Sequence, residues 1–133
     1  MAWWDRKSPV ALARAFVEAC NARDGAAVAK IVSEDFVFQD SRGGRIEGRR
    51  AMLEALSHVD RLAPDLRVEL DSAVRRGDSA LLSGRSICSE PGLACDTQWR
   101  GFARDGKLVE WHAYGAASQD SLVGLLESLK DPE

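Results

Sequence analysis

Apolar residues recur at helical spacing in the first half of the chain. A helix is predicted to begin at Ser8, whose hydroxyl can cap it, and to bury one stripe of side chains. The stripe consists of Leu12, Ala13, Phe16, Val17 and Cys20. Asp24 is expected to cap a second, short helix, and a third is predicted over residues 49–62, ended by Pro64.

From residue 65 the pattern changes to strict alternation of apolar and polar residues. Residues 65–75 are therefore predicted to form a half-buried antiparallel strand. Turn residues separate further strands, predicted over 79–89, 96–103 and 107–117, and a last amphipathic helix is predicted over 120–129. Helices followed by hairpin strands indicate an α+β domain, with the N-terminal helices packed on one face of a curved antiparallel sheet.

Length and composition fit one soluble globular domain. The chain has 133 residues, of which 45% are hydrophobic, enough to build a core without metal or disulfide staples. The domain is predicted to span residues 8–130, with flexible termini at 1–7 and 131–133. A net charge of -3 argues against a nucleic-acid partner, which normally requires a basic patch. No apolar run reaches the ~20 residues that span a bilayer, so no membrane partner and a cytoplasmic location are predicted.

Cysteine and histidine usage gives no metal motif. Cys20, Cys88 and Cys95 are expected to be free thiols, since an odd count in a cytosolic chain favours the reduced state. Cys88 and Cys95 flank a turn, and a regulatory disulfide between them is the less favoured alternative. With only His58 and His112, a zinc site is not expected, and no metal or cofactor is predicted.

The most informative segment is the predicted strand over residues 34–40. Phe36, Phe38 and Asp40 share one of its faces because side chains alternate with period 2. An acid on an aromatic face is a local conflict of the kind found at functional sites, which makes Asp40 a candidate general base. The alternative is that Asp40 ends the strand and caps the turn at Gly43 and Gly44.

Weaker catalytic candidates lie on the last two predicted strands. Gln98 and Arg100 share one face of the first, and His112, which can act as acid or base near neutrality, lies on the second. A slip of one residue moves every side chain to the other face, so the pattern leaves open which set faces the interior. If Arg100 points inward it can pair with Asp40 or bind an anionic ligand; otherwise it is a surface residue. His112 has the alternative of a hydrogen-bonded wall or interface residue.

The order of elements resembles that of the nuclear transport factor 2-like superfamily. The resemblance rests on Asp24-Gly25, on the run Ser33-Glu-Asp-Phe-Val-Phe-Gln-Asp40 and on Gly48-Arg-Arg-Ala-Met52, and it covers residues 8 to about 129. Members include the SnoaL-like polyketide cyclases, the ketosteroid isomerases and the limonene epoxide hydrolases. The resemblance implies a cone-shaped cavity between the sheet and the helices, with Asp40 where a ketosteroid isomerase has its base.

The resemblance also implies which side chains line the cavity and which are missing. The expected lining consists of Phe16, Phe36, Phe38, Leu56 and Trp111. Phe16 falls where ketosteroid isomerases have an oxyanion-binding Tyr, and Gln98 where they have a second acid. Because loss of an oxyanion donor typically costs on the order of 100-fold in rate, isomerisation of a ketosteroid is not expected.

Three kinds of function remain open from the sequence. The favoured one is a cofactor-free enzyme in which Asp40 moves a proton on a small apolar molecule. The others are a non-catalytic ligand-binding domain and an interaction domain that forms a homodimer through the sheet face. The sequence assigns no role to Trp3 and Trp4.

Overall fold

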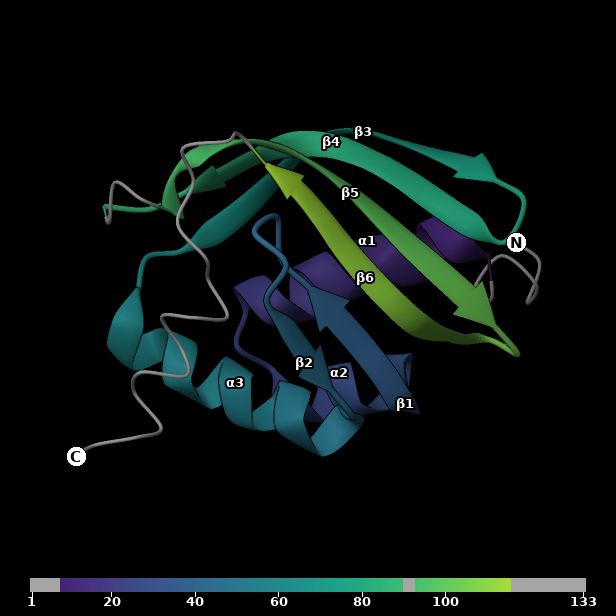
Figure 1. Ribbon diagram of the computed structural model, residues 1–133, viewed down its shortest axis with the longest axis horizontal. Helices are drawn as coiled ribbons and strands as arrows, with labels where there is room; N and C mark the ends of the chain where they lie inside the picture. The colour runs from purple at the N-terminus through teal and green to yellow at the C-terminus, as the bar shows by residue number, and fades with distance from the viewer. Residues whose placement is uncertain (1–7, 90–92, 116–133) are drawn as a thin grey trace.

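In the part of the chain that the structure describes, a curved six-stranded sheet packs over three helices (Figure 1). The computed structural model describes residues 8–89 and 93–115. Its helices are α1 (Pro9–Asn21), α2 (Gly25–Ile31) and α3 (Arg49–Leu62). Its strands are β1 (Val32–Gln39), β2 (Arg45–Glu47), β3 (Arg67–Arg76), β4 (Ser79–Ile87), β5 (Cys95–Arg104) and β6 (Lys107–Gly115). The predicted α+β class and the helices packed on one sheet face are confirmed, whereas the helix predicted over 120–129 lies outside the described residues.

The helices begin and end where the local signals predict. The Ser8 hydroxyl accepts a hydrogen bond from the Ala11 N–H at 3.0 Å, and the Asp24 carboxylate accepts one from the Ala27 N–H at 3.1 Å. Both side chains thereby satisfy N–H groups that the first helical turn leaves without a partner. α3 ends at Leu62, two residues before Pro64, as predicted.

The sheet is mixed rather than wholly antiparallel, which corrects the sequence prediction. Its strand order is β2-β1-β6-β5-β4-β3, and four of its neighbouring pairs are antiparallel. β1 and β6 run parallel, with Phe38 beside Trp111 and Gln39 beside His112. Strands β3 to β6 form a hairpin meander, and its last strand runs alongside β1 in the same direction. A parallel pair needs a long connection between its strands, and here β2, α3 and most of the meander supply it.

The core lies between the inner face of the sheet and the helices. The Phe16 ring of α1 packs against Phe36 and Trp111, with ring centroids 5.6 and 4.7 Å apart. Trp111 in turn lies over Gly101 of β5, where an added Cβ would stand 3.2 Å from the indole ring. These aromatic contacts pack α1 against the inner face of the sheet.

Candidate functional site

A pocket of about 140 Å³ lies between the inner sheet face and helices α1 and α3. This volume is comparable to that of an engineered cavity that binds benzene. The walls are largely apolar and include Phe16, Val17, Phe38, Met52, Ala55, Leu56, Val59, Trp99, Trp111 and Ala113. An apolar concave site with a few polar groups is the usual form of a small-molecule site.

Four of the five side chains expected to line the cavity do line this pocket: Phe16, Phe38, Leu56 and Trp111. Phe36 does not, which corrects that expectation. It shares the face of Phe38 but lies two residues nearer the start of β1, where α1 and α2 close over the sheet. Its side chain is fully buried beside the Phe16 ring. Phe36 therefore packs against Phe16, a residue of the pocket wall, without lining the pocket itself.

Asp40 caps the turn, as one of the two alternatives predicts, and it also lies at the pocket. Its Oδ1 accepts hydrogen bonds from the Arg42 N–H at 2.9 Å and the Gly44 N–H at 2.8 Å, so the side chain caps the turn after β1. The Gly43 N–H donates to the Asp40 carbonyl oxygen in the same turn. Asp40 is also only 5% exposed and lines the pocket. The turn thus fixes a buried carboxylate at the edge of an apolar space.

The weaker catalytic candidates lie outside the pocket. On β5, the inner face carries Thr97 and Trp99, whereas Gln98 is exposed on the outer face. Arg100 is on that outer face too, where its Nη2 donates to Glu110 at 2.9 Å. The inward reading of Gln98 and Arg100 is therefore wrong. The register of β5 against its neighbours places the alternate set of side chains toward the helices.

His112 also lies on the outer face. It pairs with Arg100 across β5 and β6, and its ring stacks on Tyr114 with centroids 4.1 Å apart. This position matches the wall or interface alternative and not a role in the pocket. Tyr114 is 48% exposed, and a homodimer contact through this outer face stays a prediction that light scattering can test.

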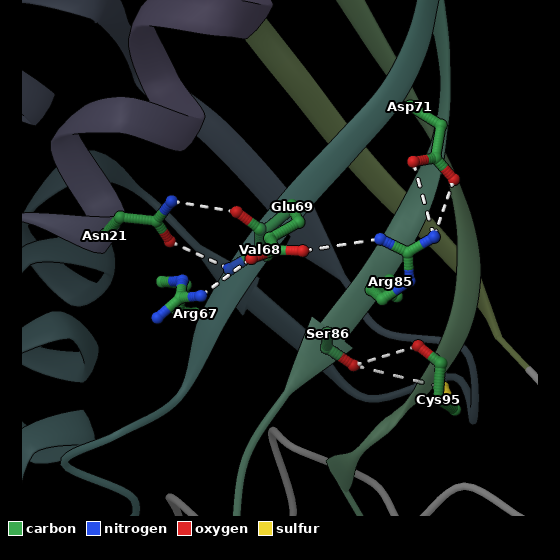
Figure 2. A network of polar contacts seen from close by, with 8 residues as sticks. All are labelled: Asn21, Arg67, Val68, Glu69, Asp71, Arg85, Ser86 and Cys95. Atoms are coloured by element: carbon green, nitrogen blue, oxygen red, sulfur yellow. Dashed lines mark hydrogen bonds and ion pairs between the residues drawn. The ribbon is translucent and has the colours of Figure 1, made fainter.

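Several polar residues of the pocket were not predicted from the sequence. Thr97 is 5% exposed, and Ser86 donates from its hydroxyl to the Leu93 carbonyl oxygen at 2.6 Å. The Asn21 side-chain amide donates to the Val68 carbonyl oxygen and accepts from the Val68 N–H, both at 2.9 Å (Figure 2). These two hydrogen bonds join the end of α1 to β3. Two signals in the sequence could have indicated these polar pocket residues: the alternation along β5, and a polar Asn21 at the end of an apolar helix. Neither signal indicates contact with a distant strand.

Arg23 fastens one corner of the pocket. It adopts a φ of 55°, a conformation that most side chains avoid, just after α1. Its guanidinium donates to the carbonyl oxygens of Cys20 and Leu66, both at 2.8 Å, and pairs with Asp60 at 2.9 Å. These bonds connect α1, α3 and the segment leading into β3, so the geometry of the corner depends on one side chain.

On the outer face of β3 and β4, charged side chains form a ladder. Arg85 lies between Glu69 and Asp71, and Arg67 also pairs with Glu69 (Figure 2). The hydrogen bond from Arg67 is the main cause that lowers the pKa of Glu69. Exposed ion pairs of this kind contribute little to stability. Of these residues Arg67 also lines the pocket, beside Val68 of the same strand.

Cys20 lines the pocket but is a poor nucleophile. Burial raises the pKa of its thiol to about 12, against the smaller opposing effect of the nearby Arg23 charge. Because the thiolate is the reactive form, Cys20 is expected to react more slowly with a disulfide reagent at about pH 8 than Cys88 and Cys95. Its labelling should accelerate only as the pH approaches 12. Mass spectrometry of labelled peptides measures this order.

The control for this prediction is the unfolded chain, in which all three thiols should react at similar rates. Equal labelling of Cys20 and Cys88 in the folded protein would contradict the buried environment assigned to Cys20. No disulfide joins Cys20, Cys88 or Cys95 within the described residues, which agrees with the sequence prediction.

Within residues 8–89 and 93–115, no three His, Cys, Asp or Glu side chains gather in a way that could hold a metal ion. Over the same residues, none of the helices has the length and apolar character needed to cross a membrane.

Comparison with known proteins places this arrangement in a family. The model of the SnoaL-like domain matches residues 13–115. No curated protein matches the chain.

Solved structures with the same fold share little sequence with the chain. An LEH-like epoxide hydrolase from M. tuberculosis is 19% identical, with 97% of this chain and 98% of that chain covered and a TM-score of 0.73. A protein of unknown function with a cystatin-like fold from Xanthomonas campestris is 18% identical over 87% of this chain and 97% of its own, with a TM-score of 0.75.

A third structure is a protein with a ketosteroid isomerase-like fold from Catenulispora acidiphila, in complex with trimethylamine. It is 16% identical over 87% of this chain and 92% of its own, with a TM-score of 0.71. Likeness at this level of identity concerns the fold, whereas the family model covers most of the chain itself. The chain therefore belongs to the SnoaL-like domain family, within the nuclear transport factor 2-like superfamily.

Proposed function

We propose that the pocket binds a small, largely apolar carbonyl compound and that Asp40 removes a proton from the carbon next to the carbonyl. The observation that carries this proposal is a buried carboxylate at the edge of a largely apolar pocket. Apolar walls select an apolar molecule, and Asp40 supplies the one carboxylate among the described residues that line the pocket. The reaction requires no cofactor.

The turn supports this role because it fixes the position of the carboxylate. The amide N–H groups of Arg42 and Gly44 hold Oδ1, so the base does not need to be ordered when a substrate arrives. Orientation of a catalytic group in advance is a large part of enzymatic rate enhancement. The family supports chemistry of the isomerase or cyclase type, and proton abstraction is a step that such reactions share.

The proposed step balances without a co-reactant. The C–H bond next to the carbonyl breaks, its proton moves to the Asp40 carboxylate, and its electron pair forms an enolate. The carboxylic acid then returns a proton to carbon and restores the carbonyl compound. In heavy water the returned proton is a deuteron after exchange with solvent, so the step can be observed without knowledge of the natural substrate.

The test uses 1-indanone, a compact apolar ketone with exchangeable hydrogens beside its carbonyl. Deuterium incorporation measured by NMR is expected to be faster with the protein than in buffer. Gln98→Ala, on the outer face of the sheet, should exchange at the rate of the unchanged protein. Ala113→Phe, which adds a ring to the pocket wall, should suppress exchange because it occupies the space beside the base.

A second candidate is a ligand-binding domain without catalytic activity. It is favoured by the position of Gln98 and Arg100 outside the pocket, since neither can assist Asp40 there. Binding of 1-indanone in the pocket with exchange no faster than in buffer would support this candidate and contradict the enzymatic one. Failure of this and other compact ketones to bind would contradict both.

A further inference from the structure

Three polar side chains of the pocket, those of Ser86, Thr97 and Asn21, already donate hydrogen bonds within the protein. Ser86 donates to the Leu93 carbonyl oxygen at 2.6 Å. Thr97 donates to the Cys95 carbonyl oxygen at 3.3 Å, and the Asn21 amide to Val68 at 2.9 Å. A hydroxyl has one proton to donate and keeps acceptor capacity after donating it. Toward a bound molecule, Ser86 and Thr97 therefore act mainly as acceptors.

Trp99 adds an indole donor to the lining of the pocket. Its side chain lines the pocket and is 6% exposed, yet in the described part of the chain its indole N–H donates no hydrogen bond. Among the described residues, the buried side-chain nitrogen and oxygen atoms without a partner are His58 Nδ1 and Arg100 Nε. The Trp99 N–H is not among these fully buried atoms, so it keeps some exposed surface. An indole N–H next to an apolar site normally finds a partner.

The register of the sheet places Trp99 in the same row as Asp40. Gln39 lies beside His112 on β6, and Ala113, the next residue of β6, lies opposite Trp99 on β5. In a parallel pair the next residue of one strand lies beside the next residue of the other, so Asp40 lies beside Ala113. Asp40, Ala113 and Trp99 therefore form one row across the sheet. With strands about 5 Å apart, the Asp40 and Trp99 backbones are separated by roughly 10 Å. Ala113 between them contributes only a methyl group.

We infer that the Trp99 indole N–H is the donor that recognises an acceptor oxygen of the bound molecule across the pocket from Asp40. The ligands are then apolar molecules with a carbonyl or ether oxygen, and matched hydrocarbons bind more weakly. This inference deepens the proposed function and rests on it only in placing a small molecule in the pocket. Trp99 is here a specificity-determining residue that acts by hydrogen bonding.

The test compares 1-indanone with indane, a hydrocarbon of nearly the same shape that has no oxygen. The chain has four tryptophans, so the nitrogen–proton spectrum of the ¹⁵N-labelled protein has four indole signals, assigned with single Trp→Phe variants. Addition of 1-indanone should move the Trp99 signal downfield, whereas indane should leave its proton shift almost unchanged. Trp99→Phe should weaken binding of 1-indanone by about 3- to 10-fold more than binding of indane, the value of one neutral hydrogen bond.

Trp111→Phe is the matched control, because Trp111 lines the same pocket one row away, beside Phe38. It should affect 1-indanone and indane alike. Equal weakening of both probes by Trp99→Phe, or an effect specific to the ketone with Trp111→Phe instead, would overturn the inference while the pocket remains a binding site. Absence of signal changes from pocket residues with either probe would overturn the proposed function as well. The signal shift is measured on the unchanged protein and does not require a folded Trp99→Phe variant, because Phe variants of Trp3, Trp4 and Trp111 assign the Trp99 signal by elimination.

Discussion

Replacing Asp40 with asparagine is expected to slow proton exchange on 1-indanone by about 100-fold or more, since a positioned general base typically contributes that much. Affinity for 1-indanone should change little, because the side chains have nearly the same shape. The asparagine Oδ1 can accept the same two hydrogen bonds from Arg42 and Gly44, so the turn is expected to persist. Exchange rates and binding constants measured on one preparation separate the two effects.

Asp40→Ala distinguishes the base from the turn. Asp40→Ala removes both the proposed base and the turn cap, so proton exchange on 1-indanone should be lost and the melting temperature should fall. With Asp40→Asn only the proton exchange should be lost. If Asp40→Asn exchanged protons as fast as the unchanged protein, Asp40 would be a turn residue and not a base. The comparison matters because the structure gives Asp40 both positions at once.

Gly84→Ala is expected to destabilise the fold by about 3 kcal/mol or more, at the upper end of the cost of overpacking. An added Cβ would meet the Glu69 carbonyl oxygen and the Leu70 Cα within the neighbouring strand, so backbone must move. The register of β3 and β4 shifts just after Leu70, and such irregularities bend a sheet. The expected loss corresponds to roughly 10 °C in melting temperature for a domain of this size.

The matched control is Gly25→Ala, at the start of α2. The nearest atom to a Cβ there is 3.9 Å away, and alanine is a better helix former, so this variant should keep or raise stability. Equal melting temperatures for the Gly84→Ala variant and the unchanged protein would show that β3 can move away without cost. The curvature that shapes the pocket would then not depend on this close approach.

Local signals were sufficient for the helices and for the position of Asp40. Ser8 and Asp24 cap the predicted helices because capping depends on residues within one turn. The same is true of the turn after β1, which Asp40 closes through its immediate neighbours. Features that are determined within a few residues can be predicted from the sequence.

The pairing of distant strands could not be predicted in this way. β5 carries one large apolar side chain on its inner face, Trp99, with Thr97 beside it, whereas Phe102 lies on the outer face. The alternation alone therefore did not distinguish the two faces, and Gln98 and Arg100 were candidates for the wrong one. Register is set by neighbouring strands, and here it shifts once more between Phe102 and Ala103.

The parallel pairing of β1 with β6 determines what surrounds Asp40. It brings Trp111 beside Phe38 and Ala113 into the row of Asp40, although β1 ends at Gln39 and β6 begins only at Lys107. This contact creates both the aromatic wall and the space next to the carboxylate. The sequence showed an acid on an aromatic face, but it did not show which side chains stand opposite.

The central claim is that the pocket holds a small apolar molecule with the Asp40 carboxylate beside its reacting carbon. A crystal structure of the protein grown with 1-indanone tests it most directly. We expect density for the ketone between α1, α3 and the inner sheet face, with its CH₂ group toward Asp40 and its oxygen toward Trp99. A pocket filled by protein side chains, or 1-indanone bound only on the outer face near His112 and Tyr114, would contradict the claim.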